Sequence, residues 1–189
     1  MNVPRGTIQR YADLVHRWNP RIQLFAPSDL NAFETRHFAD GLEPLTYVPG
    51  GAERHVDFGS GGGIPLVPMT IAMPGLHHVG VEADRRKAAF LNAVARELSL
   101  NVEIRAERLE DLAPQDADVV TARAFAPLVR TIPLLRRHLR VGGRAILQKG
   151  RRWREEVEEA NDDLDAFELR DYPTATSGDG RILVLDRMR

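Results

Sequence analysis

The segment from His55 to Ile64 constrains the fold more than any other part of this sequence. It reads His-Val-Asp-Phe-Gly-Ser-Gly-Gly-Gly-Ile, so a short apolar run leads into glycines at the alternate positions 59, 61 and 63. Glycine adopts backbone conformations that other residues avoid, and it lets the chain approach a ligand closely. The segment therefore predicts a buried strand, a sharp turn and then a helix, which together begin a βαβ unit.

A second strand is predicted to end at Glu82, in the stretch Val79-Gly-Val-Glu82. Its distance from the glycines suits a carboxylate that binds ribose hydroxyls in a βαβ unit. The glycines and this acid together predict a site for a nucleotide-like ligand. The alternative is a tight strand–helix turn without a ligand, which the glycines alone do not exclude.

The rest of the sequence alternates between helical and strand patterns. Apolar residues at helical spacing predict a helix over 8–18, ended by Asn19-Pro20, and a second helix over 31–45. Further helices are predicted over 64–73, 84–98 and 128–139, and strands over 102–105, 117–121 and 144–148. An acidic helix then precedes two strand-like segments, 167–169 and 182–185, which a turn at Ser177-Gly-Asp-Gly180 is predicted to join.

This order predicts an α/β fold with a doubly wound, mostly parallel sheet, an antiparallel last strand and N-terminal helices. No repeat or low-complexity linker interrupts the sequence, so we expect a single domain over 1–189, with 1–46 as a helical cap within it. Sheets of this kind bind their ligands at the carboxyl ends of the strands.

Composition narrows the class of protein. The 189 residues include no cysteine, which excludes disulfides and thiolate metal sites, and the six histidines show no metal-ligand spacing, so we expect no metal. No apolar run approaches membrane-spanning length, and the first residues lack the apolar stretch of a secretory signal. We therefore expect a cytoplasmic protein without a membrane partner. For the oligomeric state, on which the sequence carries no signal, we expect a monomer.

The formal net charge of −1 hides an uneven distribution. Between Thr121 and Arg154 there is no acidic residue but there are ten basic ones, and an acidic block follows from Glu155 to Asp171. Such a basic tract is typical of a surface that attracts phosphate groups. The alternative is a helix surface with paired charges, which Arg151 with Glu155 and Arg152 with Glu156 would form at i,i+4 spacing.

The glycine spacing separates two kinds of nucleotide site. The dinucleotide fingerprint needs glycine at position 64, which here is Ile64. The spacing that is present, Asp-x-Gly-x-Gly-x-Gly from Asp57, resembles motif I of the class I methyltransferases, which bind S-adenosylmethionine. This resemblance implies that the glycines approach the methionine and ribose parts of the ligand, and that Asp57 orients the turn.

From about Tyr11 to its end, the chain resembles the RsmG (GidB) family of 16S ribosomal RNA guanine-N7 methyltransferases. The matching segments, in the family's order, are Arg17-Trp-Asn19, Arg36-His37 with Asp40, Asp57 to Pro65, Arg123-Ala-Phe-Ala126 and Lys149-Gly150. The resemblance implies a class I methyltransferase (Rossmann-like) fold, S-adenosylmethionine as the cofactor, and 16S ribosomal RNA or the small ribosomal subunit as the partner.

The resemblance also implies which residues form the site. Together with motif I, it places the cofactor against Asp57, Gly59, Gly61, Gly63, Ile64, Glu82 at the ribose, the backbone of Leu109 and Glu110 at the adenine, and Arg123. We expect Arg123 and Lys149 to be the catalytic residues, because they would hold the substrate through phosphate oxygens or guanine O6. The alternatives are a structural ion pair for Arg123 and an ordinary exposed lysine for Lys149.

Four further residues are expected to position the substrate. His37 and Asp40 lie three residues apart on one helical face, where they either close over the cofactor or form a structural hydrogen-bonded pair. Arg136 and Arg137 belong to the basic tract and are expected to face the RNA backbone.

Guanine N7 carries a free lone pair at neutral pH and can attack a sulfonium methyl group in line. Such a reaction needs alignment and desolvation more than a general base. Two rival functions stay open on the sequence. One is a methyltransferase of the same fold that acts on another RNA or a small molecule, and the other is a non-catalytic nucleotide- or RNA-binding module.

Overall fold

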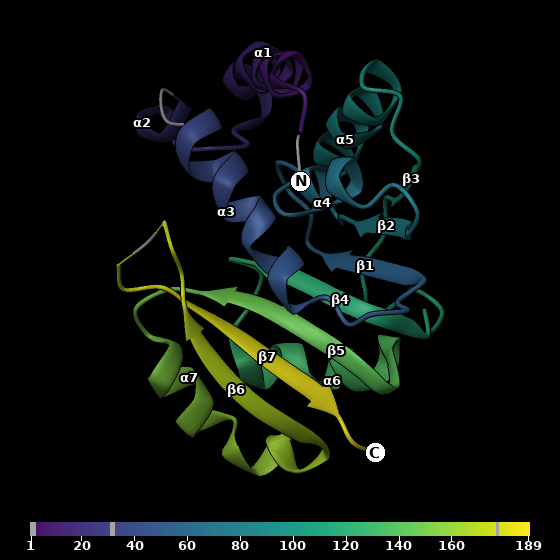
Figure 1. Ribbon diagram of the computed structural model, residues 1–189, viewed down its shortest axis with the longest axis vertical. Coiled ribbons are helices and arrows are strands. Elements are labelled where there is room, and N and C mark those ends of the chain that lie inside the picture. Colours follow the sequence, from purple (N-terminus) through teal and green to yellow (C-terminus); the bar gives the residue numbers. More distant parts are fainter. Residues whose placement is uncertain (1–2, 31–32, 177) are drawn as a thin grey trace.

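A computed structural model describes residues 3–30, 33–176 and 178–189 (Figure 1). Its centre is a sheet of seven strands in the order β3-β2-β1-β4-β5-β7-β6. The strands are β1 Arg54–Phe58, β2 His77–Val81, β3 Val102–Arg105, β4 Ala117–Arg123, β5 Leu139–Lys149, β6 Phe167–Pro173 and β7 Arg181–Arg187. The first five are parallel, and β7 runs antiparallel to both β5 and β6. The predicted α/β architecture, with its antiparallel last strand, is confirmed.

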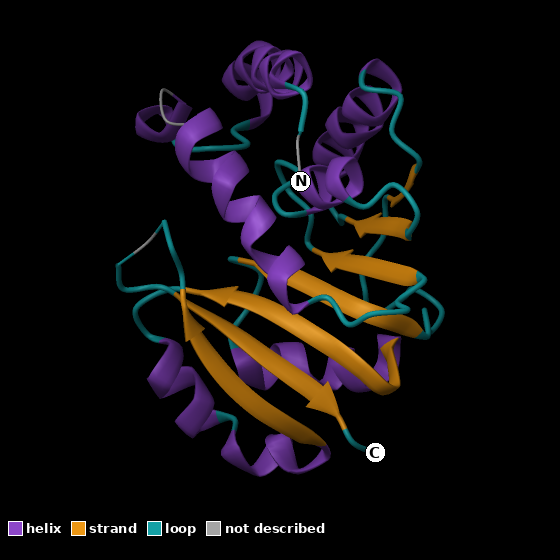
Figure 2. Ribbon diagram, in the orientation of Figure 1, coloured by secondary structure: helices purple, strands orange, loops and turns teal. Residues whose placement is uncertain are grey.

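Helices cover both faces of the sheet (Figure 2). They are α1 Arg5–Ile22, α2 Pro27–Leu30, η1 Phe33–Phe38, α3 Ala39–Leu42, η2 Glu43–Tyr47, α4 Leu66–Ala72, α5 Arg85–Glu97, α6 Leu128–His138, α7 Trp153–Glu159 and η3 Asn161–Ala166. In Figure 1, α3 crosses in front of the sheet and α6 lies behind it. Among the helices of the described ranges, none is both long and apolar enough to cross a membrane.

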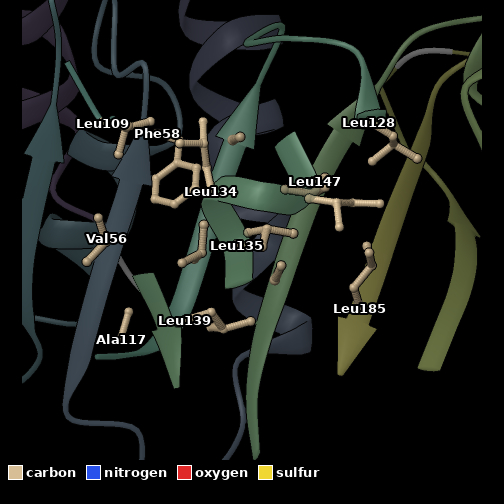
Figure 3. Close-up of a cluster of buried hydrophobic side chains, with 14 of the residues drawn as sticks. Val56, Phe58, Leu109, Ala117, Leu128, Leu134, Leu135, Leu139, Leu147 and Leu185 are labelled. Carbon is tan, nitrogen blue, oxygen red and sulfur yellow. The ribbon is translucent and has the colours of Figure 1, made fainter. Parts of the chain in front are cut away.

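The largest hydrophobic core lies between the sheet and α6. Val56 and Phe58 of β1 pack there with Leu135 and Leu147, as Figure 3 shows. A second core joins α1 to α4 and α5, where the rings of Tyr11 and Phe33 meet edge to face with their centroids 5.0 Å apart. Strands β1 and β4 are buried along nearly their whole length, because helices cover both faces of the sheet.

The N-terminal helices differ from their predicted bounds. Asn19-Pro20 does not end α1, which continues to Ile22 and stops where Gln23 takes a left-handed conformation with φ 43°. The Asn19 amide organises the turn that follows, because its oxygen accepts the N–H groups of Leu24 and Phe25 at 2.7 and 2.8 Å. In the region predicted as one helix over 31–45, three short helical segments follow one another from Phe33, and the predicted start at Asn31 lies outside the described residues.

The other boundary differences are small. Strand β5 begins at Leu139 rather than at 144, and β4 continues to Arg123 rather than to 121. Asp84 caps α5 as predicted, because its carboxylate accepts the N–H groups of Arg86 and Lys87. The turn predicted at 177–180 begins at Ser177, which lies outside the described residues.

Candidate functional site

The glycine turn after β1 strongly favours residues without a Cβ. Gly59, Gly61 and Gly63 have φ values of 64°, 52° and 88°, a left-handed region that favours glycine. A Cβ at Gly59 would lie 2.5 Å from Cδ2 of Phe125, and one at Gly63 would lie 2.6 Å from the Tyr11 hydroxyl oxygen. The turn is therefore packed from both sides, which explains why glycine occupies these positions.

Glu82, at the end of β2, holds this turn in place. Its Oε2 accepts the backbone N–H of Gly61 at 2.8 Å, and its Oε1 accepts the N–H of Asp84 at 2.8 Å. Only 9% of the residue is exposed. A buried carboxylate that accepts two N–H groups is a strong, charge-assisted anchor. Glu82 thus joins the glycine turn to the start of α5, a structural duty that its spacing in the sequence did not reveal.

A cavity of about 330 Å³ opens beside the turn, at the carboxyl ends of β1, β2 and β4. Its lining includes four of the predicted cofactor residues, Gly59, Glu82, Leu109 and Glu110. The volume is within the usual range of ligand pockets. Leu109 and Leu134 contribute apolar wall and also belong to the main core (Figure 3). The structure therefore brings together residues from 59 to 134 at the edge where sheets of this type bind ligands.

The sequence reasoning missed several lining residues: Val81, Ala83, Glu107, Arg108, Ala124, Phe125, Ala126, Arg130 and Leu134. Phe125 could have been predicted, because it follows β4 at the same sheet edge as the glycines. Ala124 carried no signal in the sequence, since alanine rarely adopts its positive φ of 49°. Within the described residues, Asp57, Gly61, Gly63, Ile64 and Arg123 are not among the lining residues.

Asp57 lies beneath the turn, in a buried chain of polar groups on three strands. Its Oδ1 is 2.6 Å from the Thr121 hydroxyl oxygen, which is 2.8 Å from Nε2 of His55. Nδ1 of His55 is 2.8 Å from Nδ1 of His78, whose Nε2 donates to the Met73 carbonyl oxygen at 2.9 Å. His55, His78 and Thr121 are fully buried, and Asp57 is 1% exposed. The paired register of β1 with β2 and β4 places these side chains on one face of the sheet.

A count of the hydrogens in this hydrogen-bonded series of side chains shows which group carries the extra proton. Each of its four contacts needs one hydrogen, while two neutral imidazoles and one hydroxyl supply three. Burial raises the pKa of Asp57 to about 7. Burial lowers the pKa of both His55 and His78. The fourth hydrogen therefore belongs to the Asp57 carboxyl, which is neutral below about pH 7.

Arg123 connects the end of β4 to the N-terminal helices. Its Nη2 donates to Nδ1 of His37 at 2.8 Å and to Oδ2 of Asp40 at 2.9 Å. Burial lowers the pKa of His37, so this ring accepts as a neutral imidazole. Gln148 on β5 donates to the Asp40 backbone oxygen at 2.9 Å. The two predicted partners, His37 and Asp40, are thus brought together around Arg123, in the structural ion pair that was the alternative for this arginine.

Lys149 is not the exposed lysine of the alternative interpretation, because its side chain is only 10% exposed. Its Nζ donates to the Ala126 carbonyl oxygen at 2.6 Å and to Oε2 of Glu156 at 2.8 Å. The same Glu156 oxygen accepts the N–H of Leu128 at 3.1 Å. Lys149 and Glu156 form a clamp on the loop after β4, which supplies a wall of the cavity.

This clamp replaces the i,i+4 charge pairs predicted for α7. Glu156 contacts Lys149 rather than Arg152. Arg152 pairs instead with Glu155 at 2.6 Å, at i,i+3 spacing. The reason is that Glu156 faces inward toward Leu128, where its carboxylate satisfies a backbone N–H.

We expect Lys149→Ala and Glu156→Ala each to lower the free energy of unfolding by about 1.5–3 kcal/mol, the usual cost of losing a hydrogen bond to a charged group. Because both side chains belong to one hydrogen-bonded unit, the double variant should cost clearly less than the two single costs combined. Urea unfolding of the four proteins measures this. Strict additivity would show that the two residues act separately.

Arg136 and Arg137 lie at the end of α6, next to the start of β5 and at the sheet edge opposite the cavity. Arg136 donates to the Asp163 carbonyl oxygen at 2.8 Å and pairs with Asp165 at 2.5 Å. Arg137 donates to the Leu112 carbonyl oxygen at 2.9 Å. These partners give both arginines a structural role and weigh against the predicted contact with substrate, which stays a prediction.

Across the ranges that the structure describes, no three His, Asp or Glu side chains are grouped so that they could hold a metal ion. The titratable side chains at the cavity are carboxylates and guanidinium groups, with Glu82 already engaged by the turn. The arrangement can therefore bind and orient a ligand without an evident nucleophile.

The family model and the relatives that match this chain carry the same description. A family model described as rRNA small subunit methyltransferase G (GidB) matches residues 5–183. The Ribosomal RNA small subunit methyltransferase G of Paracoccus denitrificans is 40% identical over 192 residues, which cover 100% of this chain and 99% of that protein. The protein of the same name from Rhodospirillum centenum is 38% identical over 190 residues, with 98% and 87% covered.

Solved structures share the fold at low sequence identity. The ribosomal protein L11 methylase of Lactobacillus delbrueckii subsp. bulgaricus superposes with a TM-score of 0.65 at 16% identity, covering 79% of this chain and 77% of that one. A 16S rRNA methyltransferase (RsmC) of T. thermophilus, in complex with AdoMet and guanosine, gives a TM-score of 0.59 at 18% identity, covering 82% and 39%. These similarities confirm the predicted class I methyltransferase fold.

Proposed function

This chain belongs to the GidB family, described as rRNA small subunit methyltransferase G, and on that premise we propose that it transfers a methyl group from S-adenosylmethionine to N7 of a guanine in 16S ribosomal RNA. The observation that best supports the proposal is the cavity between the glycine turn, Glu82 and the loop after β4. The choice of N7 rests on the family resemblance of the Arg123-Ala-Phe-Ala and Lys149-Gly segments.

The residues around the cavity fit S-adenosylmethionine. Each Glu82 oxygen accepts one backbone N–H, which leaves lone pairs for the ribose hydroxyls. Leu109, Phe125 and Leu134 offer apolar surface for the adenine ring.

When bound, S-adenosylmethionine supplies an electrophilic methyl group. Because guanine N7 has a free lone pair, no side chain has to remove a proton from it. The protein's task is then to orient the two reactants and exclude water. Lys149 and Arg123 contribute by fixing the loop and the end of β4, so we assign both of them as positioning residues.

We propose that the protein works as a monomer built from the single domain 1–189, in the cytoplasm. The acceptor would be naked 16S ribosomal RNA or the small ribosomal subunit. The relatives' name supports the small-subunit ribosomal RNA as the acceptor class.

We expect the protein to transfer label from S-adenosylmethionine to one guanine of 16S ribosomal RNA taken from a strain without the activity, and to do so in the presence of a metal chelator. Borohydride–aniline cleavage maps the label, because it cuts the strand at N7-methylguanine. Label on an exocyclic amine or a ribose hydroxyl would refute the N7 assignment. Label only on a small molecule would support the rival methyltransferase, and cofactor binding without transfer to any RNA would support the binding module.

A further inference from the structure

A second cavity, of about 300 Å³, lies at the other half of the sheet edge and has no part in the cofactor site. It is lined by Arg151, Trp153, Arg154, Gly178, Asp179 and Arg181. Arg181 begins β7 and is paired in register with Lys149, the last residue of β5. The groove therefore opens at the same edge as the cofactor cavity, next to the Lys149–Glu156 clamp that shapes the cavity wall.

Trp153 gives the groove a rigid floor that orients two arginines. The indole is 8% exposed and packs into the main core. Cζ of Arg154 lies 4.4 Å from its ring centroid, and Cζ of Arg181 lies 5.7 Å from it. Both distances are within the range of a cation–π contact, which restrains the guanidinium groups and leaves N–H groups able to donate. The stacking thus pre-organises a planar donor edge at little further entropic cost.

Arg181 is held from a second side as well. Its Nε contacts Oδ2 of Asp171 at 3.2 Å, and its Nη1 donates to the Gly180 carbonyl oxygen at 3.2 Å. Among the described residues, neither contact uses Nη2 of Arg181, so that nitrogen keeps its N–H groups for another acceptor. Asp179 is the one acidic residue in the lining, beside three arginines.

The rest of the basic tract is largely neutralised within the fold. Arg136, Arg140 and Arg144 pair with Asp165, Asp118 and Asp186, and Arg152 pairs with Glu155. Within the described part of the chain, Arg151 and Arg154 make no ion pair, and both are exposed. Arg130, which lines the cofactor cavity, and Arg137, which donates to the Leu112 carbonyl oxygen, make none either. Two of the tract's four unpaired arginines therefore line this groove.

We propose that the groove binds a phosphodiester of the RNA strand that carries the target nucleotide. The inference rests on the proposed function and adds a location to it. A planar, pre-organised guanidinium edge matches phosphate oxygens two at a time. Because Arg154 and Arg181 already cover the Trp153 ring, the groove offers no free ring for a base and reads the backbone only. It therefore sets where the strand lies and leaves the choice of base to other contacts.

The test compares RNA affinity as salt rises for wild type, Arg151→Ala, Arg154→Ala, Arg154→Lys and the neighbouring Arg152→Ala. The probe is a 16S ribosomal RNA fragment, and cofactor affinity and the thermal midpoint are measured in parallel. Arg151→Ala and Arg154→Ala should each weaken RNA binding roughly tenfold and lower the salt slope by about 1. Arg154→Lys keeps the charge but loses the planar fork, so affinity should fall while the slope stays.

Arg152→Ala removes an equal charge from a residue that already pairs with Glu155, so it should bind RNA like wild type. Cofactor affinity should be unchanged in all four variants. If the RNA affinity of wild type fell steeply with salt but Arg151→Ala and Arg154→Ala bound RNA like wild type, the groove would not be the phosphate site, while the proposed function would stand. If wild type bound no RNA and methylated only a small molecule, the proposed function itself would fail. If Arg152→Ala weakened RNA binding as much as Arg151→Ala and Arg154→Ala do, RNA would be responding to the general surface charge, and the proposed phosphate site would be wrong.

Discussion

Asp57→Asn is expected to abolish a loss of stability that the wild-type protein undergoes as pH rises from about 4 to about 7. In the folded protein, burial raises the pKa of Asp57 from its ordinary value of 3.8 to about 7. Between these two pH values the unfolded chain has released the proton and the folded chain keeps it. Stability therefore falls by about 1.4 kcal/mol per pH unit across this window, to a total of about 4 kcal/mol. Below the window and above it, this carboxyl contributes no slope.

Asparagine is a suitable replacement because it keeps the hydrogen-bond order of the neutral acid. Its Nδ2 can donate to the Thr121 hydroxyl, which can then donate to Nε2 of His55, as the protonated Asp57 allows. The variant carries no ionisable proton at this position. Its fold should be intact, and its stability between pH 4 and 7 should not decline through this group.

Other groups near Asp57 titrate as well. The quantity to follow is therefore the difference in unfolding free energy between wild type and Asp57→Asn at each pH. Burial lowers the pKa of His55 and His78, which makes them lose stability as pH falls through their unfolded value of 6.5, the opposite direction. Glu82 and Tyr11 also act on Asp57 electrostatically. These groups are common to both proteins, so their contributions largely cancel.

The measurement is urea unfolding of wild type and Asp57→Asn at half-unit steps from pH 4.5 to 8. The difference in unfolding free energy should drift in favour of the variant up to about pH 7 and then level off. Parallel curves would mean that Asp57 is ionised in the fold throughout. In that case the fourth proton would sit on one of the two histidines, and the buried chain would contain an ion pair.

The sequence predicted the parts of the site that depend on local pattern. The glycine turn, the strand ending at Glu82 and the helix capped by Asp84 follow from residues within a few positions of each other. The doubly wound, mostly parallel sheet with its antiparallel last strand followed too, because alternating β and α units leave few arrangements. The cavity then appears where a parallel sheet places it.

What the sequence could not predict depends on distant partners. Asp57 was expected to orient the turn and to contact the cofactor, but its partner Thr121, which also contacts His55, holds it beneath the turn. Glu156 reads as one of several surface acids, yet it faces Lys149 and Leu128. A run of charges in one dimension does not show which of them the fold neutralises, and that is decided by packing of elements far apart in sequence.

Glu82→Ala is expected to weaken S-adenosylmethionine binding by about 3 kcal/mol, which is on the order of 100-fold. The loss has two sources. The ribose loses its carboxylate partner, and the backbone N–H groups of Gly61 and Asp84 lose theirs, so the glycine turn loosens. Glu82→Gln should lose nearly as much, because its single carbonyl oxygen can replace only one of the two acceptors and its amide N–H faces another donor.

Glu110→Ala is the matched control, since it removes the same charge from the same cavity. Glu110 is 55% exposed at its side chain and pairs only loosely with Arg108 at 3.4 Å, and its expected contact with the adenine is through the backbone. Its substitution should change cofactor affinity little. Calorimetry gives the affinities, and hydrogen exchange at the Gly61 and Asp84 amides reports on the turn, where faster exchange is expected for Glu82→Ala. If Glu82→Ala exchanged faster but bound the cofactor like wild type, Glu82 would serve the turn alone and the ribose assignment would be wrong.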